Sequence, residues 1–138
     1  MTASLLYRIA AVLLVFYAIG HTLGFRRVDP KWGIDSYVSG LRTTQFNVQG
    51  RRHSYWDFYV GFGLFVTVLL AFAAVLAWQL GGLPAVTLAA MPLVTWGLAA
   101  CFAAATIVTW RYFFAAPIVF SVVITLCLLV AAWRSGQP

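Results

Sequence analysis

Hydrophobic residues fill four long runs of this chain, and polar residues gather in one segment between the first and second runs. The runs cover approximately residues 5–24, 55–79, 84–109 and 113–133. Each is close to the ~20 residues that a helix needs to cross a bilayer. None alternates with a period of two, which argues against the strands of a membrane barrel and favours helices. The pattern therefore predicts an all-α fold, a four-helix transmembrane bundle with a long polar loop over residues 25–54.

The composition agrees with a single integral membrane domain over residues 1–138. Of the 138 residues, 63% are hydrophobic and 9% are charged, whereas about a quarter of the residues in a soluble domain are charged. The Gly-Gly-Leu-Pro turn at 81–84 ends the second run, and Arg111 divides the third from the fourth. The first run is too long for a signal-peptide core and no small-x-small cleavage site follows it, so we expect a retained span.

Most of the charged side chains lie between Gly20 and Asp57. This stretch holds all three carboxylates, both histidines and six of the nine Lys and Arg residues. The net charge is +6. Because the basic residues flank apolar runs and do not form a basic face on a soluble domain, we expect contact with anionic lipid and no nucleic-acid binding. The excess of Lys and Arg in the first and third connections places the first loop in the cytoplasm and both termini in the periplasm.

The long first loop carries signals of a helix of its own. Asp29-Pro30 is typical of an N-cap followed by Pro at the first helical position. Apolar residues then recur at i, i+3, i+4 and i+7, which predicts a short amphipathic helix at the membrane interface. These positions are Ile34, Tyr37, Val38 and Leu41, with Trp32 before them. Such a helix would either cover the mouth of the bundle as a lid or rest on the lipid headgroups.

The titratable side chains near the second run are the candidate catalytic residues. His53 and Asp57 are four residues apart, and His21 ends the first run at a similar depth. A neutral imidazole oriented by a carboxylate can move protons on a lipid-like substrate. The structural alternative is that Ser54-x-x-Asp57 forms a capping box at the start of the second helix. Two His and one carboxylate could also ligate a metal ion, and two His could ligate haem, but no spacing here is specific for either. The sequence therefore predicts no metal and no other cofactor.

Five further residues are candidate ligand-binding residues. Arg51 and Arg52 would supply positive charge beside the histidines, and Gln49 and Trp56 flank them in the same polar stretch. Thr95 belongs to a polar stripe that recurs along the third run at helical spacing. Hydroxyl and small residues are where membrane helices usually approach each other, so Thr95 is expected either in ordinary helix packing or in a polar-lined pocket between helices.

Small residues also mark two helix-packing surfaces. Gly20 and Gly24 have the small-xxx-small spacing, which favours close packing inside the bundle and alternatively a homodimer. Small residues of the second run, which include Gly63 and Thr67, form a comparable face.

A family resemblance rests on two parts of the chain. Residues 6–25, which contain Tyr17-Ala-Ile-Gly-His21, and residues 48–63, which contain Val48-Gln-Gly and Trp56-Asp-Phe-Tyr-Val-Gly, resemble an uncharacterised family of small bacterial four-helix membrane proteins. More distantly, the layout is similar to the DoxX-like membrane proteins. The resemblance implies a location in the bacterial inner membrane, and it supplies no agreed activity and no site residues.

These observations predict a small multi-pass membrane protein that binds a small hydrophobic or lipid-like molecule between its helices. Two alternatives stay open: a cofactor-free membrane enzyme that uses His and Asp for proton transfer, and a structural or assembly subunit of a membrane complex. No carboxylate or lysine lies in the middle of a run, which argues against an ion-coupled transporter. Cys101 and Cys127 lack the spacing of a redox pair.

Overall fold

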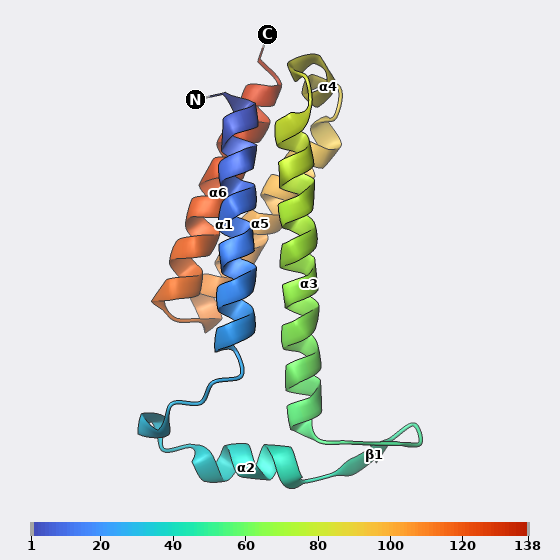
Figure 1. Ribbon diagram of the computed structural model, residues 1–138, viewed down its shortest axis with the longest axis vertical. Helices are drawn as coiled ribbons and strands as arrows, with labels where there is room; N and C mark the ends of the chain where they lie inside the picture. Colours follow the sequence, from blue (N-terminus) through green and yellow to red (C-terminus); the bar gives the residue numbers. More distant parts are fainter. Residues whose placement is uncertain (1, 138) are drawn as a thin grey trace. The chain divides into compact units, whose positions relative to one another are not determined.

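The computed structural model describes residues 2–137 and contains four helices that are long and apolar enough to cross a membrane (Figure 1). They are α1 (Ala3–Gly24), α3 (Tyr55–Gly82), α5 (Pro92–Tyr112) and α6 (Ala115–Ser135). Hydropathy and length thus identified all four long helices. The ends of these helices lie within three residues of the predicted ends, except that the third helix starts well after the predicted start at residue 84.

The fold is not purely a four-helix bundle, and the all-α prediction needs correction. The chain also forms a short 3-10 helix, two further α-helices and a two-stranded antiparallel hairpin. These are η1 (Pro30–Trp32), α2 (Asp35–Thr43), α4 (Ala85–Ala89), β1 (Phe46–Val48) and β2 (Arg51–His53).

The hairpin forms because its two turn residues adopt left-handed backbone conformations. Gln49 has φ of 51° and Gly50 has φ of 83°, and two central residues with positive φ characterise the tight turns that match the twist of paired strands. The Gly50 N–H donates to the Asn47 side-chain oxygen at 2.9 Å. The strands are three residues each, which is too short for period-two alternation to be recognised in the sequence.

The loop helix starts later than the sequence indicated. Asp29 does cap a helix, since its carboxylate accepts the Lys31 N–H at 2.9 Å, but this helix is η1 and it ends at Gly33 with φ of 64°. The amphipathic helix α2 begins separately at Asp35. The left-handed conformation at Gly33 breaks the continuous helix that the Asp29-Pro30 signal predicted.

The predicted third span is divided into two helices. Residues 85–89 form α4, and α5 begins at Pro92, so the single run predicted over residues 84–109 is interrupted before Pro92. Proline lacks an N–H and its ring clashes with the preceding turn, which makes the first position of a new helix its preferred place. At the other end, Arg111 belongs to the last turn of α5 and only Phe113 and Phe114 connect α5 to α6.

Two compact units divide the chain, and α1 and α3 each contribute to both. The first contains residues up to 17 and from 70 onward, and the second contains residues 18–69. In the first unit, α5 and α6 pack along each other (Figure 1). Its core is rich in alanine, which lets helix backbones approach closely. Fully or almost fully buried core residues are Ala10, Leu14, Ala77, Ala99, Ile124, Leu128 and Ala131.

In the second unit, the end of α1 packs on the first half of α3 around Gly63. A Cβ at Gly63 would overlap the Phe25 ring, so only glycine fits there without movement. The Thr22 and Thr67 hydroxyls form a hydrogen bond of 2.9 Å between the same two helices. Gly20 and Gly24 are exposed, and no atom lies within 4 Å of a Cβ built on either. Within this unit they therefore take no part in close helix packing, and the homodimer stays a prediction.

Replacing Gly63 with alanine should destabilise the protein by about 1–3 kcal/mol, the usual cost of overpacking a filled site. Gly61 is the matched control on the same helix, because its side-chain position is open. Gly61→Ala should be neutral or should raise the unfolding free energy by up to about 1 kcal/mol through helix propensity. Unfolding by SDS titration, followed by tryptophan fluorescence, measures both variants. Equal stability of the two would contradict the packing around Gly63.

Candidate functional sites

His21 lies in the last turn of α1 and is held by helix packing. Its Nε2 is 3.0 Å from the Gly63 carbonyl oxygen of α3, and because a carbonyl can only accept, Nε2–H is the donor. The imidazole also stacks on the Phe25 ring, with ring centroids 5.1 Å apart. In a neutral ring this arrangement leaves Nδ1 as the nitrogen that could accept a proton.

Asp57 and Ser54 form the capping box that the sequence suggested as the structural alternative. The Asp57 N–H donates to the Ser54 hydroxyl oxygen at 3.2 Å. In return, the Ser54 N–H and hydroxyl donate to Asp57 Oδ2 at 2.8 and 2.9 Å. These bonds satisfy backbone donors at the start of α3, where a negative charge is also favoured by the helix dipole. The carboxylate of Asp57 therefore has a structural role at the helix start.

His53 ends β2 and joins an aromatic group that attaches the hairpin to α3. The strand register pairs Phe46 with His53, which puts both side chains on one face of the hairpin. His53 lies 5.5 Å from the Phe58 ring, and Phe46 lies 5.0 Å from Tyr55 and 6.0 Å from Phe58. The imidazole thus fills a half-buried place between the hairpin and the first turns of α3.

The three candidate catalytic side chains have different neighbours. His53 and Asp57 lie on either side of Ser54 in the chain, whereas His21 contacts Gly63. Gly63 is six residues beyond Asp57, which is about 9 Å along α3. Within residues 2–137 no group of three or more His, Cys, Asp and Glu side chains is arranged to hold a metal ion. A shared acid–base site formed by His21, His53 and Asp57 stays a prediction.

One candidate ligand-binding residue of the polar loop, Trp56, takes part in a cation–π contact that sequence reasoning missed. The Arg42 guanidinium, from α2, lies 4.2 Å from the Trp56 ring centroid of α3. Arg51 shares the face of the hairpin that holds His53, and Arg52 lies on the opposite face. Gln49 is exposed at the turn. No local motif could have indicated the Arg42–Trp56 contact, because it depends on the path of the hairpin between the two residues.

Thr95, the remaining candidate, lies in the first unit among other buried hydroxyl groups. It is 1% exposed, and its hydroxyl donates to the carbonyls of Met91 and Pro92 within its own helix region. The hydroxyls of Tyr7 and Ser135 lie beside it. Tyr7 was not predicted as a site residue, because a tyrosine in an apolar run is indistinguishable from an ordinary membrane-interface aromatic.

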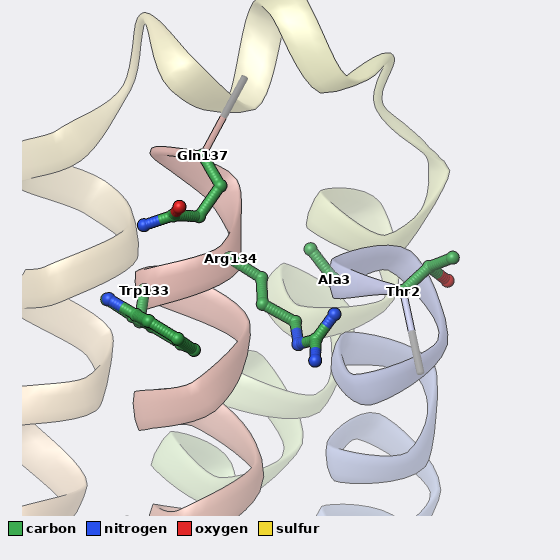
Figure 2. Close-up of a pocket in the computed structure, with 5 residues that line it drawn as sticks. All are labelled: Thr2, Ala3, Trp133, Arg134 and Gln137. Atoms are coloured by element: carbon green, nitrogen blue, oxygen red, sulfur yellow. The ribbon is translucent and has the colours of Figure 1, made fainter.

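A hollow of about 370 Å³ opens in the first unit between the start of α1 and the end of α6 (Figure 2). Its lining residues are Thr2, Ala3, Trp133, Arg134 and Gln137. The Arg134 side chain extends from α6 towards Ala3 of α1 (Figure 2). No pattern in the sequence indicated this hollow, because its lining residues come from segments that are far apart in the chain.

Comparison with known proteins gives no assignment: no family model matches the chain, and neither a curated protein nor a solved structure matches it.

Ser54→Ala should lower the free energy of unfolding by about 1 kcal/mol, the usual cost of losing a side-chain helix cap. Ser54→Gly is the matched control, since glycine at this position costs only a few tenths. SDS unfolding of both variants measures the difference. An alanine variant as stable as the original protein would show that the capping box contributes nothing.

Proposed function

We propose that this is a small multi-pass membrane protein that binds anionic, lipid-like molecules through the segment formed by residues 26–56, here called the interfacial segment. The observation that supports this most directly is the position of Arg42 on the Trp56 ring. An arginine stacked on an aromatic ring keeps its charge and its outer N–H donors available, and phosphate is a good acceptor for them.

The charge of the interfacial segment favours an anionic partner. It contains six Lys and Arg residues against two Asp residues, and one of these two, Asp29, is engaged as the cap of η1. Basic residues beside a membrane span gain roughly 1 kcal/mol each near an anionic bilayer surface. The segment therefore carries an excess of positive charge that anionic headgroups can neutralise.

Helix α2 presents the apolar surface that interfacial binding needs. Tyr37 is 75% exposed and Leu41 is 45% exposed, and Trp32 of η1 is 60% exposed. On a soluble surface this exposure would be unfavourable, whereas at the level of the headgroups the same side chains enter the apolar layer. Apolar and basic groups side by side are the combination expected of a helix that rests on lipid.

The length of α3 is consistent with this position. Its 28 residues span about 42 Å, and the hydrocarbon core is only about 30 Å thick. If the apolar part of α3 fills the core, its first turns extend into the headgroup layer. Tyr55, Trp56 and Tyr59 lie in these turns, which is where tyrosine and tryptophan are enriched in membrane proteins.

The proposal includes an orientation and a location. Basic loops remain on the cytoplasmic side, so we propose that the interfacial segment faces the cytoplasm and both termini face the periplasm of a bacterial inner membrane. The cytoplasmic leaflet is also the one that carries a negative surface potential.

Two other functions stay open as weaker proposals. A proton-transferring enzyme would use His53, Asp57 and His21, but the Asp57 carboxylate already accepts two hydrogen bonds from Ser54, which favours a structural role. An assembly subunit or homodimer could use the exposed Gly20 and Gly24, since the space around both is open.

Removing the positive charge of the interfacial segment should remove a preference for anionic lipid. Phosphatidylglycerol should raise the melting temperature of the detergent-solubilised protein more than phosphatidylcholine does. The triple variant Arg42→Gln/Arg51→Gln/Arg52→Gln should lose most of this difference. Arg111→Gln, a single basic residue outside the segment, should retain it. Full retention by the triple variant would refute the proposal, as would a loss of the same size in Arg111→Gln.

A charge on the apolar face of α2 should detach the helix from the bilayer. In nanodiscs, Tyr37→Asp should increase the rate of tryptic cleavage after Arg42 several-fold, because a carboxylate cannot enter the apolar layer. Ser36→Asp adds the same charge one residue away on the polar face and should change the rate little. Identical cleavage rates in the two variants would mean that α2 does not rest on lipid.

A further inference from the structure

Arg8 of α1 is held against the last turns of α3, and all the residues that hold it belong to the first unit. Its Nε donates to the Gly81 carbonyl oxygen at 3.4 Å, and the Ser4 hydroxyl donates to the same oxygen. The guanidinium carbon lies 5.2 Å from the centroid of the Trp78 ring. Because the last carbonyls of a helix have no partner within the helix, Arg8 and Ser4 together cap the end of α3.

Gly81 admits the Arg8 side chain to the surface of α3. A Cβ built at Gly81 would lie 2.8 Å from Arg8 Cγ and 3.0 Å from the Ser4 carbonyl oxygen, so a larger residue would displace the arginine or the start of α1. The arginine is thus held at its stem, at Nε and on one face of the guanidinium. A side chain that is already fixed loses less entropy when it binds a ligand.

The Arg8 guanidinium keeps donors that no other part of the described chain uses. Within residues 2–137 its hydrogen bond is made by Nε, so the N–H groups of both terminal nitrogens remain for a ligand. Arg8 is exposed, and no Asp or Glu occurs in the sequence before Asp29 or after Asp57. The first unit therefore contains no side-chain carboxylate that could pair with this charge.

The guanidinium lies at the level where lipid headgroups meet the hydrocarbon. The 22 residues of α1 span about 33 Å, close to the ~30 Å of the hydrocarbon core, and side chains on a helix lean towards its start. Trp78 is exposed, and tryptophan is enriched at this boundary. An arginine here is stable when it pairs with a headgroup, whereas an unpaired charge at the edge of the hydrocarbon is unfavourable.

We propose that Arg8, stacked on Trp78, binds the phosphate group of a phospholipid at the start of α1, the end of this helix that is remote from the interfacial segment. The planar guanidinium presents N–H groups that match two phosphate oxygens. Val75 is exposed and lies three residues before Trp78 on the same face of α3, so it gives the acyl chain an apolar surface.

This site differs from the interfacial segment in what it recognises. Every phospholipid carries the phosphate group, so the Arg8 site binds zwitterionic as well as anionic lipid, whereas the interfacial segment prefers anionic lipid. The two sites share no residue, and each can fail without the other.

Native mass spectrometry of the full-length protein in a non-ionic detergent tests the site with dioleoylphosphatidylcholine. This lipid should bind saturably, and dioleoylglycerol, which has the same chains without the phosphate, should not. Arg8→Gln should weaken the affinity about tenfold or more, the effect of losing hydrogen bonds to a charged group. Arg8→Lys keeps the charge without the planar fork and should weaken it several-fold. Arg134→Gln, which removes another exposed arginine of the first unit, should leave it unchanged.

Two glycine variants test the position of the arginine without changing any charge. Gly81→Ala should weaken the affinity for phosphatidylcholine, because the added Cβ displaces the Arg8 stem. Gly82→Ala is the matched control, because its side-chain position is open, and it should bind as the original protein does. The triple variant Arg42→Gln/Arg51→Gln/Arg52→Gln should also bind phosphatidylcholine normally, which separates this site from the interfacial segment.

Inorganic phosphate distinguishes the two sources of the group. Competition by phosphate that is lost in Arg8→Gln supports a site for the phosphate group alone, whereas lipid binding without competition supports a site that also needs the acyl chains. The site is refuted if dioleoylglycerol binds as tightly as phosphatidylcholine, if Arg8→Gln keeps full affinity, or if Arg134→Gln loses as much. Should Arg8→Gln fail to fold, Arg8→Lys decides, since full affinity in that variant contradicts pairing through the planar fork.

Discussion

The hydrocarbon core of a bilayer contains no water to pair with backbone groups, and this constraint determines most of what the chain does. All four apolar runs become helices, because a helix pairs its own N–H and C=O groups. The same rule governs the hydroxyl side chains inside the helices. Thr22, Thr106, Thr109 and Ser135 each donate to the carbonyl four residues earlier in the chain. The charged side chains lie in the loops or close to the helix ends.

Packing between the helices depends on small side chains and on a few polar bridges. Alanine dominates the core of the first unit, and the absent side chain of Gly63 admits the Phe25 ring in the second. Thr106 and Thr125 join α5 to α6 at 2.8 Å, as Thr22 and Thr67 join α1 to α3. Apolar side chains are as stable in lipid as in the protein interior, so the hydrophobic effect does not drive membrane helices together. Close backbone approach and interhelical hydrogen bonds hold them together instead.

Sequence reasoning succeeded where one local property decides the structure. Hydropathy and length located the long helices, and the Ser54-x-x-Asp57 spacing identified a real capping box. It failed where several weak signals compete. The break before Pro92 was missed, because residues 84–109 form one continuous apolar run. The hairpin at 46–53 was missed because its turn, Gln49-Gly50, joins strands of only three residues.

The candidate sites were less predictable than the helices, because they join residues that are distant in the chain. Arg42 reaches Trp56 only after the hairpin turns the chain back, and Tyr7 meets Thr95 and Ser135 only in the folded bundle. Of the predicted site residues, Thr95 lies beside the hydroxyls of Tyr7 and Ser135. His21 instead contacts a backbone carbonyl of α3, and Asp57 caps the start of that helix. The resemblance to small bacterial four-helix membrane proteins and, distantly, to DoxX-like proteins remains an expectation from the sequence.

The basic, aromatic interfacial segment, residues 26–56, is proposed to bind anionic lipid headgroups. Hydrogen–deuterium exchange of α2 and the hairpin, measured in nanodiscs of phosphatidylglycerol and of phosphatidylcholine, tests it most directly. Binding predicts slower exchange of residues 35–53 in the anionic bilayer, and molar salt should reduce the difference because it screens charge beyond about 3 Å. Equal exchange in the two bilayers, with no response to salt, would contradict the claim.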